Sequence, residues 1–271
     1  MLRRMGISVD RRHLALAGFC LATVLLIPMA QYVPGGLVTL VSGILIWRTP
    51  DPTFQRRMSV LLGTVVWLAL APIETRTDNL GYARLVAFFG MAIIVPVAIF
   101  RKYDPGLIDF RLWPHKFRWL DIFYVGLAVP LAYVLIRWYF FTVNLEMPVQ
   151  WFLPAEYDAG ETWRLVIGLN SVGIWDELFF VNIMFCVLRS MFSFRIANLA
   201  QAVVYTSVLY DMAFIGIGPA LVYFFALTQG SMYEQAKCLL YVLIVHLVID
   251  AFLLESIIEF YYPTHGSFHW F

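Results

Sequence analysis

The residues of this sequence that could do chemistry are acidic side chains and a histidine inside apolar segments. Asp176 and Glu177 are adjacent within residues 174–189, IWDELFFVNIMFCVLR. His246 and Asp250 are four residues apart in LIVHLVIDAFL, a spacing that places both on one face of a helix. A charged side chain costs about 3 kcal/mol or more near the middle of a bilayer, so such residues usually mark a functional site. We therefore expect function at these two segments.

A carboxylate beside an imidazole can activate water, because the carboxylate accepts a proton and the imidazole holds or passes one. In this interpretation Glu177 and Asp176 hold the water. His246 donates to the oxyanion or shuttles the proton, and Asp250 orients His246. Asp211, in a neighbouring apolar run, is a further acidic candidate.

The same residue types leave other chemistries open. His and carboxylate oxygens are ordinary ligands of zinc or manganese, so a metal at the Glu177/His246 site stays open, while no organic cofactor is indicated. Intramembrane acids also form proton or cation paths in transporters. A lone histidine in a span is often a hydrogen-bonded core residue, and an asparagine such as Asn182 often joins helices.

The composition is that of a polytopic membrane protein. Hydrophobic residues make up 61% of the 271 positions and charged residues only 14%. A net charge of +1 excludes nucleic acid as an expected partner, since such binding needs a basic surface. The expected partners are the lipid bilayer and a membrane-associated peptide or protein.

About 20 apolar residues cross the hydrocarbon layer, which is roughly 30 Å thick, as a helix. The sequence thus predicts an all-α bundle of eight or nine transmembrane spans. These lie near residues 13–32, 33–48, 58–73, 83–100, 119–143, 163–188, 194–214, 216–231 and 238–259. We expect residues 1–118 to form amino-terminal transmembrane helices with an interfacial loop, and residues 119–271 to form the part that carries the polar segments.

The distribution of basic residues predicts the orientation. Arg and Lys concentrate before the first span, between the second and third, and between the fourth and fifth, whereas the alternate loops are acidic. By the positive-inside rule the amino terminus is cytoplasmic and the protein is integral to the cell membrane. Arg137, near the end of a span, is expected to snorkel or to pair with an acid of the loop 144–161.

The predicted spans place the polar groups at one depth. With a rise of 1.5 Å per residue, Glu177 lies roughly 16 Å from the cytoplasmic edge, His246 roughly 14 Å and Asp250 roughly 20 Å. Asp211 would lie about a turn further out. Two helices could therefore present a carboxylate pair and a His/Asp pair to each other.

At these residues the chain resembles the CPBP family of intramembrane proteases, the CAAX proteases and bacteriocin-processing proteins also called the Abi family. The family carries EExxxR, FxxxH, and HxxxN or HxxxD on three helices. Residues 176–181, DELFFV, are similar to the first motif, with Val181 at the arginine position, and residues 246–250, HLVID, match the third. By spacing, Tyr205 takes the phenylalanine position of the second motif and Leu209 its histidine position.

The resemblance covers roughly residues 160–258 and implies a CAAX-protease-like core that hydrolyses peptide bonds with Glu and His. In the family the first glutamate and the FxxxH histidine activate water, and the third motif stabilises the oxyanion. Here Asp176 is one methylene shorter than that glutamate, and Leu209 cannot accept a proton. The alternatives to an intramembrane endopeptidase are therefore an inactive relative that acts as a scaffold, chaperone or immunity partner, and a proton- or cation-coupled carrier.

Overall fold

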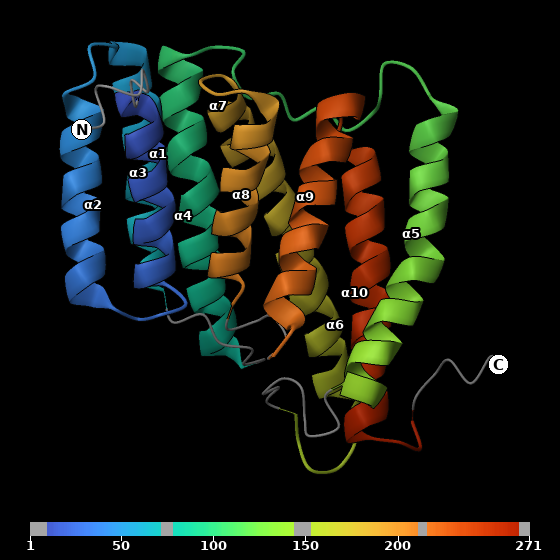
Figure 1. Cartoon of the computed structure of the whole chain (residues 1–271). Coiled ribbons are helices and arrows are strands. Elements are labelled where there is room, and N and C mark those ends of the chain that lie inside the picture. Colours follow the sequence, from blue (N-terminus) through green and yellow to red (C-terminus); the bar gives the residue numbers. More distant parts are fainter. Residues whose placement is uncertain (1–9, 72–77, 144–152, 211–215, 266–271) are drawn as a thin grey trace.

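The computed structural model describes residues 10–71, 78–143, 153–210 and 216–265, and every regular element within these ranges is a helix (Figure 1). The α-helices are α1 (Arg11–Leu26), α2 (Tyr32–Trp47), α3 (Pro52–Ala69), α4 (Asn79–Tyr103), α5 (Trp119–Trp138), α6 (Ala159–Asp176), α7 (Phe185–Arg189), α8 (Phe194–Val208), α9 (Gly218–Ala236) and α10 (Leu240–Tyr261). Two π-helical segments, η2 (Tyr139–Val143) and η3 (Glu177–Met184), continue α5 and join α6 to α7.

Four of these continuous helical stretches are long and apolar enough to cross a membrane. They are Asn79–Tyr103, Trp119–Val143, Ala159–Arg189 and Leu240–Tyr261. The shorter α2 is also apolar. The prediction of an all-α protein with apolar membrane-length helices is thus confirmed.

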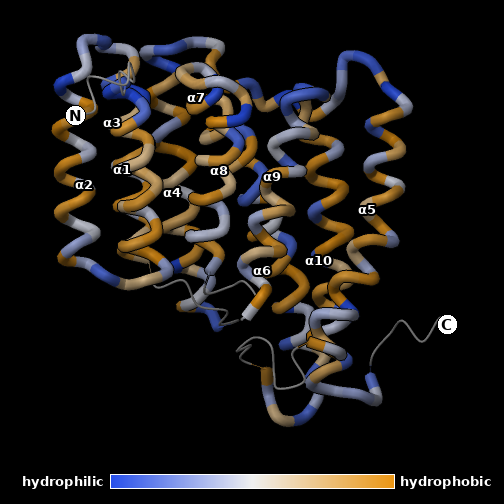
Figure 2. Tube along the Cα trace, in the orientation of Figure 1, coloured by the Kyte–Doolittle hydropathy of each residue, from blue (hydrophilic) through white to orange (hydrophobic). Residues whose placement is uncertain are grey.

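The helices run alternately up and down, so their connections gather at two ends (Figure 1). Hydrophilic residues collect at the helix ends and apolar residues fill the middle (Figure 2). We call one end the basic end, because the helix ends and connections there carry many cationic residues. They include Arg48, Arg56, Arg57, Arg101, Lys102, Arg111, Lys116, Arg118 and Arg189.

Several helices begin where the sequence supplies an aspartate as N-cap. Asp10 and Asp51 accept hydrogen bonds from first-turn N–H groups of α1 and α3. Asp78 and Asp158 do the same for α4 and α6. A side-chain acceptor satisfies backbone donors that have no partner within the helix, which fixes the start of the helix.

Aromatic packing fixes the position of α6. The Trp175 indole N–H donates to the backbone oxygen of Phe89 on α4 at 2.7 Å, and the two rings stack with centroids 3.9 Å apart. The Trp175 ring also stacks on that of Phe179 in η3, with centroids 5.0 Å apart. These contacts set the rotation of the helix at the point where it becomes η3.

Helix α5 packs against α10 and is tied to it by an ion pair. Arg137 contacts both carboxylate oxygens of Glu259 on α10, and its guanidinium lies over the Phe141 ring. The pairing expected with an acid of the loop 144–161 is therefore corrected: the partner comes from α10, which reaches the same level of the bundle.

At the basic end an ion cluster joins α3 to the end of α4. The Arg56 Nε lies 2.9 Å from Asp104 Oδ2, and the Arg57 Nη2 lies 2.7 Å from Asp104 Oδ1. Arg57 also donates to the Ser190 hydroxyl at 2.9 Å. The hydrogen bond from Arg56 holds the pKa of the Asp104 carboxyl below its ordinary value of 3.8.

Replacing Asp104 by Asn is expected to lower the free energy of unfolding by about 2 kcal/mol, since it removes charged hydrogen bonds to two arginines. Because the folded-state pKa is lowered, the contribution of Asp104 is fully present above pH 3.8 and is lost as the pH falls through the lowered folded-state value. Thermal unfolding of the detergent-solubilised protein as a function of pH measures this. Asp109→Asn, which removes an exposed partner of Arg111, is the matched control and should leave stability unchanged.

Candidate functional site

The structure brings the two predicted polar segments together around the His246 imidazole. Glu177 Oε1 lies 2.6 Å from His246 Nδ1. On the other side of the ring, Asp250 Oδ1 and Asp176 Oδ2 lie 3.6 and 3.7 Å from Nε2. All four side chains are buried. We call these four residues the acid–histidine cluster.

Two further residues complete the hydrogen bonding of this cluster. The Tyr205 hydroxyl on α8 lies 3.3 Å from His246 Nδ1 and also within reach of Asp176. Gln229 on α9 donates to Glu177 Oε1 and to the Val242 carbonyl, both at 2.9 Å. Residues of η3, α8, α9 and α10 therefore meet at one point.

The change from α-helix to π-helix occurs between the two acids. Asp176 is the last residue of α6, and Glu177 is the first residue of η3. Successive side chains on a helix point in different directions, so the adjacent acids reach the two nitrogens of the ring from different sides. Short π-helical segments within α-helices frequently lie at functional sites.

Gly173 allows α10 to approach α6. A Cβ atom at this position would lie 2.2 Å from Asp250 Oδ2, 2.9 Å from His246 Cδ2 and 3.1 Å from His246 Nε2. Only a glycine leaves room for these side chains one turn before Asp176. The position of the imidazole therefore depends on a residue that carries no functional group.

The cluster holds several unpartnered polar atoms. Asp176 Oδ1, Glu177 Oε2 and Asp250 Oδ2 are buried without a hydrogen-bond partner among the described residues. Three carboxylates and one imidazole are therefore buried together, and they compensate one another only in part. Such a group can take up and release protons, which is the property that acid–base catalysis requires.

The cluster is arranged about the imidazole and not about a shared point of coordination. Among the described residues, no three His, Cys, Asp or Glu side chains are placed to hold a metal ion. The geometry thus places carboxylates, an imidazole and a phenol in contact with one another.

Sequence reasoning located four of its five candidates at one site. Glu177, Asp176, His246 and Asp250 are in contact, as the predicted depths required. Asp211 lies outside the described residues, so its predicted role stays a prediction. Leu209 is the half-buried C-cap of α8 and brings no ionisable group.

Gln229 and Gly173 were missed as site residues, and Tyr205 was placed at the phenylalanine position of the second motif without a role of its own. A polar residue within the apolar run 216–231 was the available signal for Gln229. No pattern in the sequence identifies Gly173, because its importance comes from its contact with α10.

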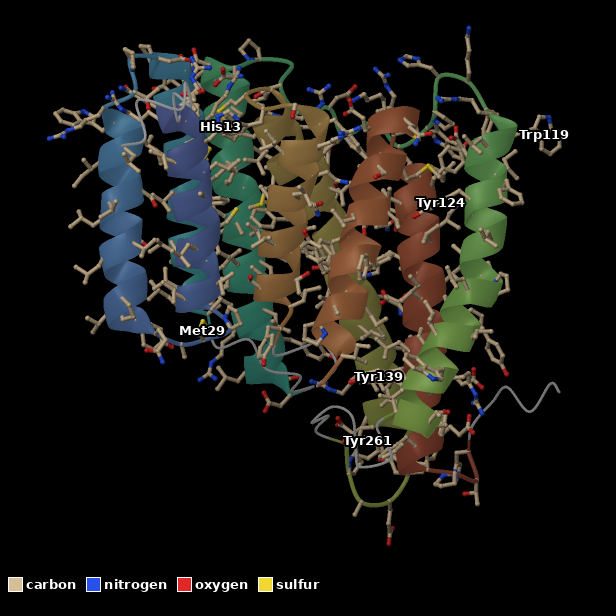
Figure 3. All side chains as sticks on the ribbon, in the orientation of Figure 1. His13, Met29, Trp119, Tyr124, Tyr139 and Tyr261 are labelled. Atoms are coloured by element: carbon tan, nitrogen blue, oxygen red, sulfur yellow. The ribbon has the colours of Figure 1, made fainter. Side chains whose placement is uncertain are left out.

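A groove opens beside the cluster, between α5 and the pair α9 and α10. Its inner part is a cavity of about 260 Å³, lined almost entirely by apolar side chains. Val245 and Phe225 form part of the wall, and the Phe225 ring meets the imidazole edge to face with centroids 5.3 Å apart. Tyr124 and Tyr139 of the same α5–η2 stretch mark the two ends of this wall (Figure 3). The groove thus reaches the level of His246, separated from it by one aromatic ring.

The fold and the site define a class: a helical protein whose described residues form four apolar helices of membrane-spanning length and a buried acid–histidine cluster. No family model, no curated protein and no solved structure matches the chain.

Gly173→Ala is expected to push Asp250 and His246 away from α6 and to lower the free energy of unfolding by about 1 to 3 kcal/mol, because the added methyl group overlaps Asp250 Oδ2. Chemical denaturation in detergent measures the loss. Gly126→Ala on α5, where a Cβ meets nothing within 4 Å, is the matched control and should not destabilise.

The cause of that loss can be isolated by removing the colliding oxygen. Asp250→Ala should cost less stability in the Gly173→Ala background than in the wild-type protein. Additive effects of the two substitutions would contradict the geometry described for Gly173.

Proposed function

We propose that this protein is an integral membrane protein of eight or nine spans, with a cytoplasmic amino terminus in the cell membrane. We further propose that it is an intramembrane endopeptidase, similar to the CPBP proteases, that cleaves membrane-associated peptides or protein tails. The observation that carries this proposal is the 2.6 Å contact between Glu177 and His246, with two more carboxylates facing the second ring nitrogen.

The proposed reaction uses the free oxygen of Glu177 as the base. Oε1 is held by His246 and Gln229, whereas Oε2 has no hydrogen-bond partner among the described residues. Glu177 takes a proton from water, the resulting hydroxide attacks the peptide carbonyl carbon, and the C–N bond breaks as the leaving nitrogen receives a proton.

The roles of His246 and Tyr205 follow from their contacts. Both imidazole nitrogens face carboxylates, so His246 is assigned to holding and passing the proton, with Asp250 orienting the ring. The Tyr205 hydroxyl, beside Nδ1, is the neutral donor that we assign to the developing oxyanion. From the sequence, His246 was expected either to donate to the oxyanion or to shuttle the proton. We now assign the oxyanion to Tyr205 and the proton shuttle to His246.

The groove between α5 and α9 supports a substrate that arrives within the bilayer. Its lining is apolar, and its wall includes Val245, next to His246 on α10. A peptide segment in the hydrocarbon layer could approach there without entering water. Rotation of the Phe225 ring away from His246 would then let the backbone of that peptide reach the cluster.

A second candidate function is a proton- or cation-coupled carrier. The observation that favours it is Gln201 on α8, which is fully buried and has neither carboxamide atom partnered among the described residues. Asn198 lies one turn nearer the basic end and also has an unpartnered oxygen. A row of such groups from the cluster toward the basic end is typical of a proton path.

Glu177→Gln and His246→Ala are each expected to abolish cleavage of a membrane-peptide library in proteoliposomes, because either change removes the base or its proton partner. Mass spectrometry of the new peptide termini measures this. Glu259→Gln, which disturbs an ion pair on α10 outside the cluster, is the matched control and should retain cleavage.

Three outcomes separate the functions. Cleavage by the wild-type protein that both cluster variants lose supports the endopeptidase. A pH change inside the vesicles that depends on Glu177, without cleavage, supports the carrier. Neither activity, together with loss of folding in the variants, would overturn both and leave an inactive scaffold.

A further inference from the structure

The basic-end mouth of the groove contains a carboxylate that no described residue satisfies. Asp121, in the first turn of α5, is 1% exposed, and neither carboxylate oxygen has a hydrogen-bond partner among the described residues. Arg118 forms a long ion pair with it, in which Nε lies 3.9 Å from Oδ2, beyond hydrogen-bond distance. A buried carboxylate without a donor is costly, so this position points to a polar ligand.

Asp121 lies on the wall of a second cavity that continues the apolar one. This outer cavity has a volume of about 490 Å³. The two cavities share four lining residues and therefore form one groove; these are Tyr124, Leu127, Phe224 and Thr228. The outer part adds Ser231 and Gln235, so the groove changes from almost entirely apolar near His246 to partly polar at its mouth.

The mouth lies where lipid headgroups would lie. Trp119, at the start of α5, is 85% exposed and points away from the bundle (Figure 3). Trp113 and Phe117 in the preceding loop are also exposed, and aromatic residues of this kind mark the membrane interface. Lys116 and Arg118 in the same loop are exposed cations.

The loop that carries these cations is fixed to the bundle. The backbone N–H groups of Leu239 and Leu240, at the start of α10, donate to the carbonyl oxygens of Arg111 and Leu112 at 2.9 and 3.0 Å. The hydroxyl of Tyr241, the residue after Leu240, has no hydrogen-bond partner among the described residues and is close enough to Asp121 to interact with it electrostatically. Anionic and cationic groups are thus held side by side at the mouth.

We propose that this groove binds a phospholipid with a primary ammonium headgroup. One acyl chain lies along the apolar wall toward Val245 and Ile249, and the ammonium donates to Asp121. The phosphate faces Arg118. An ammonium with three N–H donors satisfies both carboxylate oxygens, whereas a trimethylammonium group cannot donate and an anionic glycerol headgroup is repelled by Asp121. The site is separate from the acid–histidine cluster and does not depend on the proposed cleavage.

Native mass spectrometry of the detergent-solubilised full chain tests this with phosphatidylethanolamine, its mono- and dimethyl derivatives, phosphatidylcholine and phosphatidylglycerol, all with the same acyl chains. The wild-type affinity should fall along the methylation series, by about tenfold in total, as donors to Asp121 are lost. Equal affinity for all headgroups would overturn the proposal.

Two pairs of variants locate the site. Asp121→Asn should abolish the preference for phosphatidylethanolamine and leave phosphatidylcholine binding unchanged, whereas the exposed Asp109→Asn should alter neither. Ala128→Phe, which fills the groove, should weaken both lipids, whereas Val129→Phe on the outer side of α5 should not. A preference that survives Asp121→Asn, or binding that survives Ala128→Phe, would place the lipid elsewhere and refute the assignment.

Discussion

The contact between Glu177 and His246 is the interaction on which the rest of the structure depends. Three carboxylates and an imidazole are buried in an apolar bundle, and each would be costly there alone. The four side chains reduce this cost by contacting one another. These contacts require η3 and α10 to lie at the same level and to turn the correct faces toward each other. The stacked Trp175 and the close approach at Gly173 supply that rotation and that distance.

At the basic end of the bundle, a largely buried carboxylate is compensated by arginines of the protein itself. Asp104 there is held by two arginines and joins α3 to α4. Asp121 differs from it, since it is buried at the same end without a hydrogen-bond partner among the described residues. This contrast between two aspartates, one satisfied within the protein and one not, is the basis for assigning a ligand to the second.

The sequence predicted much of this arrangement through two simple rules. Hydrophobic length predicted the helical class and the four membrane-length apolar helices found among the described residues, and the spacing of four between His246 and Asp250 put both on one face. The shared depth of Glu177 and His246 followed from counting residues along straight helices. These inferences succeeded because they depend only on the rise and period of a helix.

The sequence could not supply the contacts that depend on how helices pack. Tyr205 and Gln229 join the site because α8 and α9 turn particular faces toward η3. When a helix is apolar on all sides, its sequence does not show which face packs inward. The change from α-helix to π-helix at Glu177 alters which side chains face inward, and no residue pattern in the sequence predicts this change. Arg137 was expected to snorkel or to pair with a loop acid, because the sequence does not show that α10 brings Glu259 to its level.

The nitrogen NMR spectrum of His246 in the purified protein tests the central claim most directly, with the His246→Gln variant used to assign the signals. If the account is right, Nδ1 shows a strong hydrogen bond that Glu177→Gln abolishes, while Asp250→Asn changes Nε2 chiefly. If both nitrogens resemble those of a solvent-exposed histidine, and neither substitution alters them, then the acid–histidine cluster does not form and the proposed chemistry has no basis.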